Sequence, residues 1–252
     1  MWVSTQGFHA SKRGNVESEY EDAYFPESVC LQDLSEFRCA VADGASESAF
    51  SREWARLLVR GYYRRRMTLG RLQRCWSRMV TRRPVPWYLE EKIRRGAHAT
   101  LVGLSIRDGE PSARSGGSWR VVAVGDSCLF HVRDDELLTV APMSRSDEFN
   151  NHPHLISTDP ATTFGLNKSR VTVVSGEWQP RDVFYLLTDA LAEWTLGKHE
   201  AGRPPWPLFS SMGHDGDSSG AGQRSFEALV ADLRENDGLH NDDTTLLRVE
   251  VA

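Results

Sequence analysis

Acidic residues that could bind a metal ion recur wherever a buried strand is expected to meet a loop. Four such places are Glu21-Asp22, Asp43-Gly44, Thr188-Asp189 and Asn241-Asp242-Asp243, and Gly125-Asp126-Ser127 lies in a turn between two expected strands. Strand ends can project several carboxylates into one pocket, where they repel each other and resist ionising. A divalent cation removes that repulsion, and an all-oxygen set of ligands suits Mg²⁺ or Mn²⁺.

Such a pocket could hydrolyse phosphate esters. Two cations roughly 3.5–4 Å apart can lower the pKa of a shared water and stabilise charge on phosphoryl oxygens. No Ser, Cys or His nucleophile is then needed, and the chain has no G-x-S-x-G, P-loop or H-E-x-x-H pattern. Taken singly, Asp43-Gly44, Asp126 and the 241–243 segment are each more typical of a turn or solvated loop. Their order and spacing together favour a metal site.

The elements that would position these acids can be inferred from apolar patterning. Strands are predicted at Glu19–Phe25, Phe37–Ala42, Trp119–Val124, Cys128–Val132, Glu136–Val140, Arg170–Ser175, Val183–Leu187 and Thr244–Val251, with the segments between 119 and 140 forming a meander. Helices are predicted from Ser46 or Ser48 to about Arg66, and over Leu69–Thr81, Trp87–Ile106, Ala190–Leu196 and Ser225–Glu235. The Gly-rich stretches Asp108–Ser118 and Gly197–Gly222 are expected to be loops. Strands, then a helical block, then more strands predict an α+β sandwich of antiparallel sheets covered by helices.

Composition sets the broad class. The chain has 252 residues, 40% of them hydrophobic, and no linker divides it, so one domain spanning 1–252 is expected. It shows neither a signal peptide pattern nor an apolar run long enough for a membrane span, which favours a cytoplasmic protein. The four cysteines lack CxxC spacing, so they are expected to be reduced thiols and not zinc ligands.

The net charge of −5 conceals a basic block. Between Arg52 and Arg95 there are 14 Lys and Arg against 3 Asp and Glu. Arg52, Arg56, Arg60 and Arg64 stand four residues apart and would form one ridge on a helix. This ridge could dock an acidic partner or could be a solvated helix face. A dedicated nucleic-acid protein is disfavoured because the rest of the chain is strongly acidic.

The acidic motifs, in their order, resemble the metal-dependent type 2C protein phosphatases, the PPM family. The matching pieces are Glu-Tyr-Glu-Asp-Ala, Ala-Val-Ala-Asp-Gly-Ala-Ser, Val-Ala-Val-Gly-Asp-Ser-Cys, Leu-Leu-Thr-Asp-Ala-Leu and Asn-Asp-Asp-Thr-Thr-Leu-Leu, and they span about Gly14 to Val251. The segment after Asp43-Gly44 looks more like a bacterial branch. The resemblance implies a four-layer α-β-β-α sandwich with two central antiparallel sheets, and a serine/threonine phosphatase acting on a kinase-phosphorylated protein.

The resemblance also implies roles for particular residues. Two Mn²⁺ or Mg²⁺ ions would be bridged by Asp43, one of them also held by Glu21 and the Gly44 carbonyl. Asp189 and Asp242 would bind the other ion. Asp22 would hold metal-bound water, and Asp126 with Asp189 would bind a third, weaker ion.

Three positions depart from the family pattern. Glu17 stands where an arginine usually clamps the substrate phosphate, so Lys12 or Arg13 is expected to supply that charge. Ala190 replaces a glycine, and Cys128 replaces an arginine. No metal ligand is lost, so an active enzyme is the leading prediction. The alternatives are a pseudophosphatase that binds a phosphoprotein without turnover and a regulator that docks through the arginine ridge.

Overall fold

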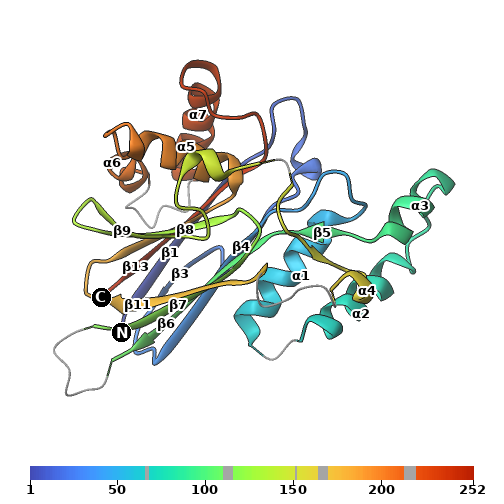
Figure 1. Cartoon of the computed structure of the whole chain (residues 1–252), viewed down its shortest axis with the longest axis horizontal. Helices are drawn as coiled ribbons and strands as arrows, with labels where there is room; N and C mark the ends of the chain where they lie inside the picture. Colours follow the sequence, from blue (N-terminus) through green and yellow to red (C-terminus); the bar gives the residue numbers. More distant parts are fainter. Residues whose placement is uncertain (66–67, 110–115, 151, 164–169, 213–219) are drawn as a thin grey trace.

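Two antiparallel sheets lie face to face at the centre of the molecule (Figure 1). The computed structural model describes residues 1–252 except 66–67, 110–115, 151, 164–169 and 213–219. The six-stranded sheet has the order β3 (Ser28–Leu31), β1 (Val3–Ala10), β13 (Thr244–Val251), β12 (Val183–Leu187), β8 (Cys128–Arg133), β9 (Glu136–Ala141). The five-stranded sheet has the order β11 (Thr172–Trp178), β7 (Gly117–Val124), β6 (Leu101–Asp108), β4 (Glu36–Ala42), β2 (Ala23–Phe25). A small ladder pairs β10 (Ile156–Ser157) with β5 (His98–Ala99).

Helices cover the outer face of each sheet. The six-stranded sheet packs against α5 (Asp189–Glu200), α6 (Trp206–Ser210) and α7 (Ala221–Asn236). The five-stranded sheet packs against α1 (Ser51–Arg64) and α2 (Leu69–Val80). Shorter helices are α3 (Trp87–Arg95), α4 (Pro160–Thr163), η1 (Glu17–Glu19) and η2 (Ser146–Glu148). The α+β, four-layer α-β-β-α sandwich predicted from the sequence is confirmed.

Burial on both faces explains why the second half of β4 is apolar. In β4, Phe37, Cys39 and Val41 join the core between the two sheets. The alternate residues Ala40 and Ala42 face the helical layer. Side chains alternate across a strand, so the stretch Cys39–Ala42, which is buried on both sides, is apolar at every position. Asp43 is the first residue beyond this buried run.

The long helix predicted over Trp87–Ile106 is wrong. The helix α3 ends at Arg95, and the chain then forms β5 and β6. Gly96 follows α3 with a φ of 79°, which breaks the helix. The apolar residues of Leu101–Ile106 are spaced as a helix would need, but they pair with β4 and β7.

The meander predicted between residues 119 and 140 is half right. The strands β8 and β9 form an antiparallel hairpin. The strand β7 belongs to the other sheet, so the Gly125–Ser127 turn carries the chain from one sheet to the other. That crossing places Asp126 at the junction of the two sheets.

The loop predicted over Gly197–Gly222 is wrong in part, since it contains the end of α5, all of α6 and the start of α7. Residues 213–219 of that prediction, and residues 110–115 of the loop predicted at Asp108–Ser118, lie outside the described residues. The strand predicted over Glu19–Phe25 begins only at Ala23. None of the helices formed by the described residues combines the length and apolar content needed to cross a bilayer.

Candidate metal centre

Three carboxylates converge where the two sheets meet. Asp43 follows β4, Asp126 lies in the turn between β7 and β8, and Asp189 is the first residue of α5. Each offers a carboxylate oxygen, and these oxygens all lie within 4.8 Å of one another. A cavity of about 580 Å³ opens over them and is also lined by Gly44 and Asp242. Three of the acids predicted from sequence motifs far apart in the chain are therefore brought together.

The cluster is strained electrostatically in the absence of a cation. Burial, with repulsion from Asp189, raises the pKa of Asp126 to about 7. Burial, with repulsion from Asp242 and against a hydrogen bond from the Ala190 amide, raises the pKa of Asp189 to about 6. The pKa of Asp43 is also raised, by burial and then by Asp22 and its other acidic neighbours. Carboxylates held ionised at neutral pH in this site would require a positive charge between them.

Asp22 lies behind the cluster and is 1% exposed. Its Oδ2 accepts a hydrogen bond of 2.7 Å from the Thr245 hydroxyl. Its Oδ1 is buried and has no hydrogen-bond partner among the described residues, and the same is true of Oδ1 of Asp126. A buried carboxylate oxygen without a partner is costly. These two oxygens are therefore suited to a cation or to the water around one.

A loop from the N-terminal part of the chain brings the Glu21 backbone beside Gly44. The Asp243 carboxylate accepts hydrogen bonds from the Lys12 amide at 2.8 Å and from the Glu21 amide at 2.6 Å. The Glu21 carboxylate accepts a hydrogen bond from the Ser51 hydroxyl at the start of α1. A Cβ added to Gly44 would lie 2.7 Å from the Glu21 carbonyl oxygen, so this close approach requires glycine. Glu21 and Gly44 are therefore neighbours through their backbones, whereas the Glu21 carboxylate is not part of the three-acid cluster.

Asp242 lies at the edge of the cavity and is more exposed than the three clustered acids. Its carboxylate is 3.4 Å from the Lys12 Nζ, with side-chain exposures of 40% for Lys12 and 47% for Asp242. Arg13 is exposed, and its amide donates to the Asn241 side chain. Of the two expected phosphate-binding residues, Lys12 contacts an acid of the site and Arg13 has a backbone contact beside it.

Glu17 is engaged away from the cavity. Its carboxylate lies 3.0 Å from the His9 Nε2 and accepts a hydrogen bond from the Ser11 hydroxyl. It lines a separate cavity of about 260 Å³ together with Arg52, Arg56 and Arg60. The arginine ridge is thus partly engaged by its own chain, since Arg52 also donates to the Ser18 carbonyl.

Sequence reasoning missed several residues that position the acids. The Thr100 hydroxyl accepts from the Asp43 amide at 3.0 Å and lies 2.6 Å from the Ser127 hydroxyl. Lys92 and Arg95 of α3 line the cavity over the acids. The positioning roles of Asp243 and Thr100 depend on contacts across the sheets. In the sequence, the basic residues of α3 stand out only as members of the basic block between Arg52 and Arg95.

Comparison with known proteins gives matches in structure but not in sequence. No protein-family model matches the chain, and no curated protein matches it. The Mycobacterium tuberculosis serine/threonine phosphatase PstP superposes with a TM-score of 0.57 at 14% identity, covering 100% of this chain and 99% of that one. The catalytic domain of PstP with two manganese ions gives 0.53 at 17% identity, covering 99% of each chain.

RsbX in complex with magnesium gives a TM-score of 0.52 at 17% identity and covers 100% of this chain and 96% of that one. These neighbours span nearly the full length of both chains, so the likeness includes both sheets and both helical layers. The five acidic motifs had suggested the same group of proteins. The resemblance is confirmed at the level of structure: this chain has the fold of the metal-dependent type 2C phosphatases.

Proposed function

We propose that the chain is a Mn²⁺- or Mg²⁺-dependent phosphatase that removes phosphate from phosphoserine and phosphothreonine in proteins. The observation that carries the proposal is the convergence of Asp43, Asp126 and Asp189 under an open cavity, with raised pKa values and buried unpartnered oxygen. A structural ion-pair network would instead supply basic side chains to such acids. Among the described residues, Lys12 is the one lysine or arginine that forms an ion pair with these acids, and it does so with Asp242 at the exposed edge. The Arg234 guanidinium donates to the Asp242 carbonyl and not to its carboxylate.

The residues present fit two divalent cations. Asp43, Glu21 and the Gly44 carbonyl would hold one ion, and Asp43, Asp189 and Asp242 the other, with Asp126 and Asp189 available to a third. Bound there, such ions would supply a water nucleophile at neutral pH and offset phosphoryl charge. The carboxylates supply the negative charge that binds the ions, and the protein orients them before the substrate arrives.

Contacts within the protein orient three of these residues. Thr100 fixes the Asp43 backbone, the Ala190 amide donates to Asp189 at 2.6 Å, and Asp243 ties down the loop carrying Glu21. Asp22 is held by Thr245, which leaves one Asp22 oxygen to orient water at the site. Lys12, or Arg13 beside it, would bind the substrate phosphate at the Asp242 edge. Preorganised groups of this kind lower the reorganisation needed during reaction.

This proposal includes a domain spanning residues 1–252, a cytoplasmic location and a substrate phosphorylated by a serine/threonine kinase. A second candidate is a pseudophosphatase that binds a phosphoprotein without turnover. It is favoured by Glu17, because that carboxylate stands where the family has a phosphate-binding arginine and is engaged with His9.

The test is hydrolysis of p-nitrophenyl phosphate and a phosphothreonine peptide with Mn²⁺, with Mg²⁺, and with excess chelator. We expect turnover that needs the metal and that Asp43→Asn reduces by at least about 100-fold, as expected when a residue central to transition-state stabilisation is lost. Asp147→Asn, at an exposed ion pair with Arg145, is the matched control and should retain full activity. Full activity in chelator would refute the mechanism, and Mn²⁺ binding without turnover would favour the pseudophosphatase.

A further inference from the structure

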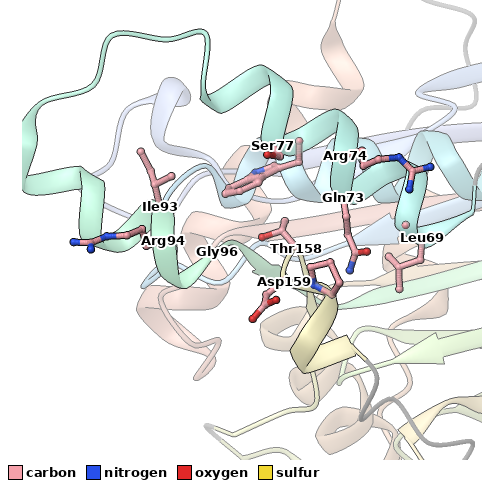
Figure 2. Close-up of a pocket in the computed structure, with 12 residues that line it drawn as sticks. Leu69, Gln73, Arg74, Ser77, Ile93, Arg94, Gly96, Thr158 and Asp159 are labelled. Atoms are coloured by element: carbon pink, nitrogen blue, oxygen red, sulfur yellow. The ribbon is translucent and has the colours of Figure 1, made fainter.

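A larger cavity lies beside the metal centre and has no role in the mechanism above. It has a volume of about 660 Å³ and lies between α2, α3 and the turn that joins β10 to α4 (Figure 2). Its walls include Leu69, Gln73, Trp76, Ile93, Thr158 and Pro160. We refer to it as the α2–α3 groove. Its size suits one or two inserted side chains, and its walls are mainly apolar.

The helix α3 separates this groove from the metal centre. Ile93 and Arg94 line the groove, whereas Lys92 and Arg95, on the same helix, line the cavity over the carboxylates. Gly96, which follows α3, lines both. A chain that crosses α3 could therefore occupy both cavities at once.

The groove has a fixed floor. Gly96 has a φ of 79°, and a Cβ there would lie 2.6 Å from the Thr158 hydroxyl oxygen. That hydroxyl accepts a hydrogen bond of 2.8 Å from the Ala97 amide. The Gln73 side-chain amide donates to the Ser157 carbonyl at 3.1 Å, which joins α2 to the same ladder. These contacts preform the groove and limit the ordering cost of binding.

The charged residues around the two cavities indicate which kind of peptide segment would bind there. Arg94 and Arg74 are exposed and lie at opposite ends of the groove in Figure 2. Lys92 and Arg95, also exposed, lie on the catalytic side of α3, where Arg95 is paired with Glu91 and Lys92 adds positive charge. Asp159, the acid that lines the groove, accepts a hydrogen bond from the Ala161 amide at the start of α4. The groove combines mainly apolar walls with basic ends, which complements a segment that carries an apolar side chain and acidic residues.

We propose that the α2–α3 groove binds the segment of a phosphoprotein substrate that flanks the phosphorylated residue, and that it selects an apolar side chain with acidic neighbours. The segment would cross α3 at Gly96, with the phosphorylated residue over the carboxylates and the acidic residues near Arg74 and Arg94. This inference rests on the proposed function, and it adds a substrate preference to it. Lys92 and Arg95 would guide the chain between the cavities.

The test compares two phosphothreonine peptides of equal length and with one leucine each. One has Asp and Glu around the leucine, and the other has Lys in those places. We expect the full chain with Mn²⁺ to use the acidic peptide with at least about a tenfold higher kcat/KM. The double variant Arg74→Glu/Arg94→Glu should lose about tenfold in kcat/KM for the acidic peptide, mainly through KM, because two attractive surface charges become repulsive.

Two further variants separate the groove from general charge. Arg78→Glu changes an exposed arginine on α2 that does not line the groove, so it should keep the peptide preference and the rate on p-nitrophenyl phosphate. Ser77→Trp would fill the groove without adding charge and should also raise KM for the acidic peptide. Equal use of both peptides by the unmodified chain would overturn the proposal, as would an equal effect of Arg78→Glu.

A peptide-binding measurement tests the inference even if the chain hydrolyses no phosphate ester. If p-nitrophenyl phosphate is not hydrolysed with Mn²⁺, fluorescence anisotropy of the labelled acidic phosphopeptide with the full chain replaces kinetics. Weaker binding to Arg74→Glu/Arg94→Glu than to Arg78→Glu would support the groove. Absence of binding would overturn it, as would displacement by single-stranded DNA at a lower concentration than by unlabelled peptide.

Discussion

Replacing Asp126 with asparagine should change how the stability of the metal-free protein depends on pH. Asp126 is 3% exposed, and burial with repulsion from Asp189 raises its pKa from 3.8 to about 7. The folded protein therefore keeps a proton on Asp126 that the unfolded chain has already lost. A group whose pKa is raised on folding contributes stability at low pH that is lost as the pH rises through its folded pKa. Asparagine has no such titration.

The magnitude follows from the shift. Each pKa unit corresponds to about 1.4 kcal/mol, so the free energy of unfolding of the metal-free wild type should fall by about 1.4 kcal/mol per pH unit between about pH 4 and 7 from this group. Between pH 5 and pH 8, Asp126→Asn should therefore gain about 3 kcal/mol relative to the wild type. Any cost of packing an amide there cancels in this comparison, because it does not depend on pH.

The assay is urea unfolding in excess chelator at pH 5, 6, 7 and 8, followed by circular dichroism. The matched control is Asp147→Asn, because Asp147 is exposed and its Arg145 neighbour lowers the pKa of its carboxyl, so no gain at higher pH is expected. Parallel pH profiles for the wild type and Asp126→Asn would refute the claim that burial, with repulsion from Asp189, raises the pKa of this carboxyl.

Three further predictions concern the surroundings of the site. Gly44→Ala should lower the free energy of unfolding by about 1–3 kcal/mol, because its Cβ would meet the Glu21 carbonyl oxygen at 2.7 Å. The same variant should weaken Mn²⁺ binding in calorimetry. The control is Gly197→Ala, whose Cβ would meet nothing closer than 3.9 Å and which should not destabilise the protein. Thr100→Val should cost about 1–3 kcal/mol in urea unfolding by leaving the Asp43 amide without its acceptor, and an unchanged midpoint would contradict that role. Asp182→Asn should cost about 3 kcal/mol without changing Mn²⁺ affinity, because this buried carboxylate binds Arg133 and His131 away from the site. Burial opposes the ionisation of Asp182, but those hydrogen bonds lower its pKa to about 2. The stability that this carboxylate contributes should therefore be lost as the pH falls from about 4 to 2. A free energy of unfolding of the wild type that stays constant over that range would count against this role.

The sequence predicts those parts of the site whose position follows from the local pattern of apolar and polar residues. Asp43 follows an apolar run long enough to be a doubly covered strand, and Thr244–Val251 was predicted with its observed bounds. Acidic residues next to such runs are placed by the strand itself. The strand β1 was not predicted, because Val3–Ala10 mixes polar and apolar residues without a clear alternation. It forms a strand because it pairs with β13 along its whole length.

The remaining parts depend on contacts distant in sequence. Leu101–Ile106 has apolar residues that continue the helical spacing of α3, and the pairing of β6 with β4 and β7 overrides that local pattern. Asp243 holds the Lys12 and Glu21 amides from more than 220 residues away. One wall of the α2–α3 groove likewise depends on the close contact between Gly96 and Thr158, which are distant in sequence.

The central claim is that the converging carboxylates are a metal centre, and crystals soaked in Mn²⁺ test it most directly. The anomalous signal of manganese would locate each ion independently of the protein coordinates. We expect two ions bridged by Asp43, one also bound by Glu21 and the Gly44 carbonyl, and the other by Asp189 and Asp242. Manganese absent from these carboxylates at saturating concentration, or bound without Asp43, would contradict the account.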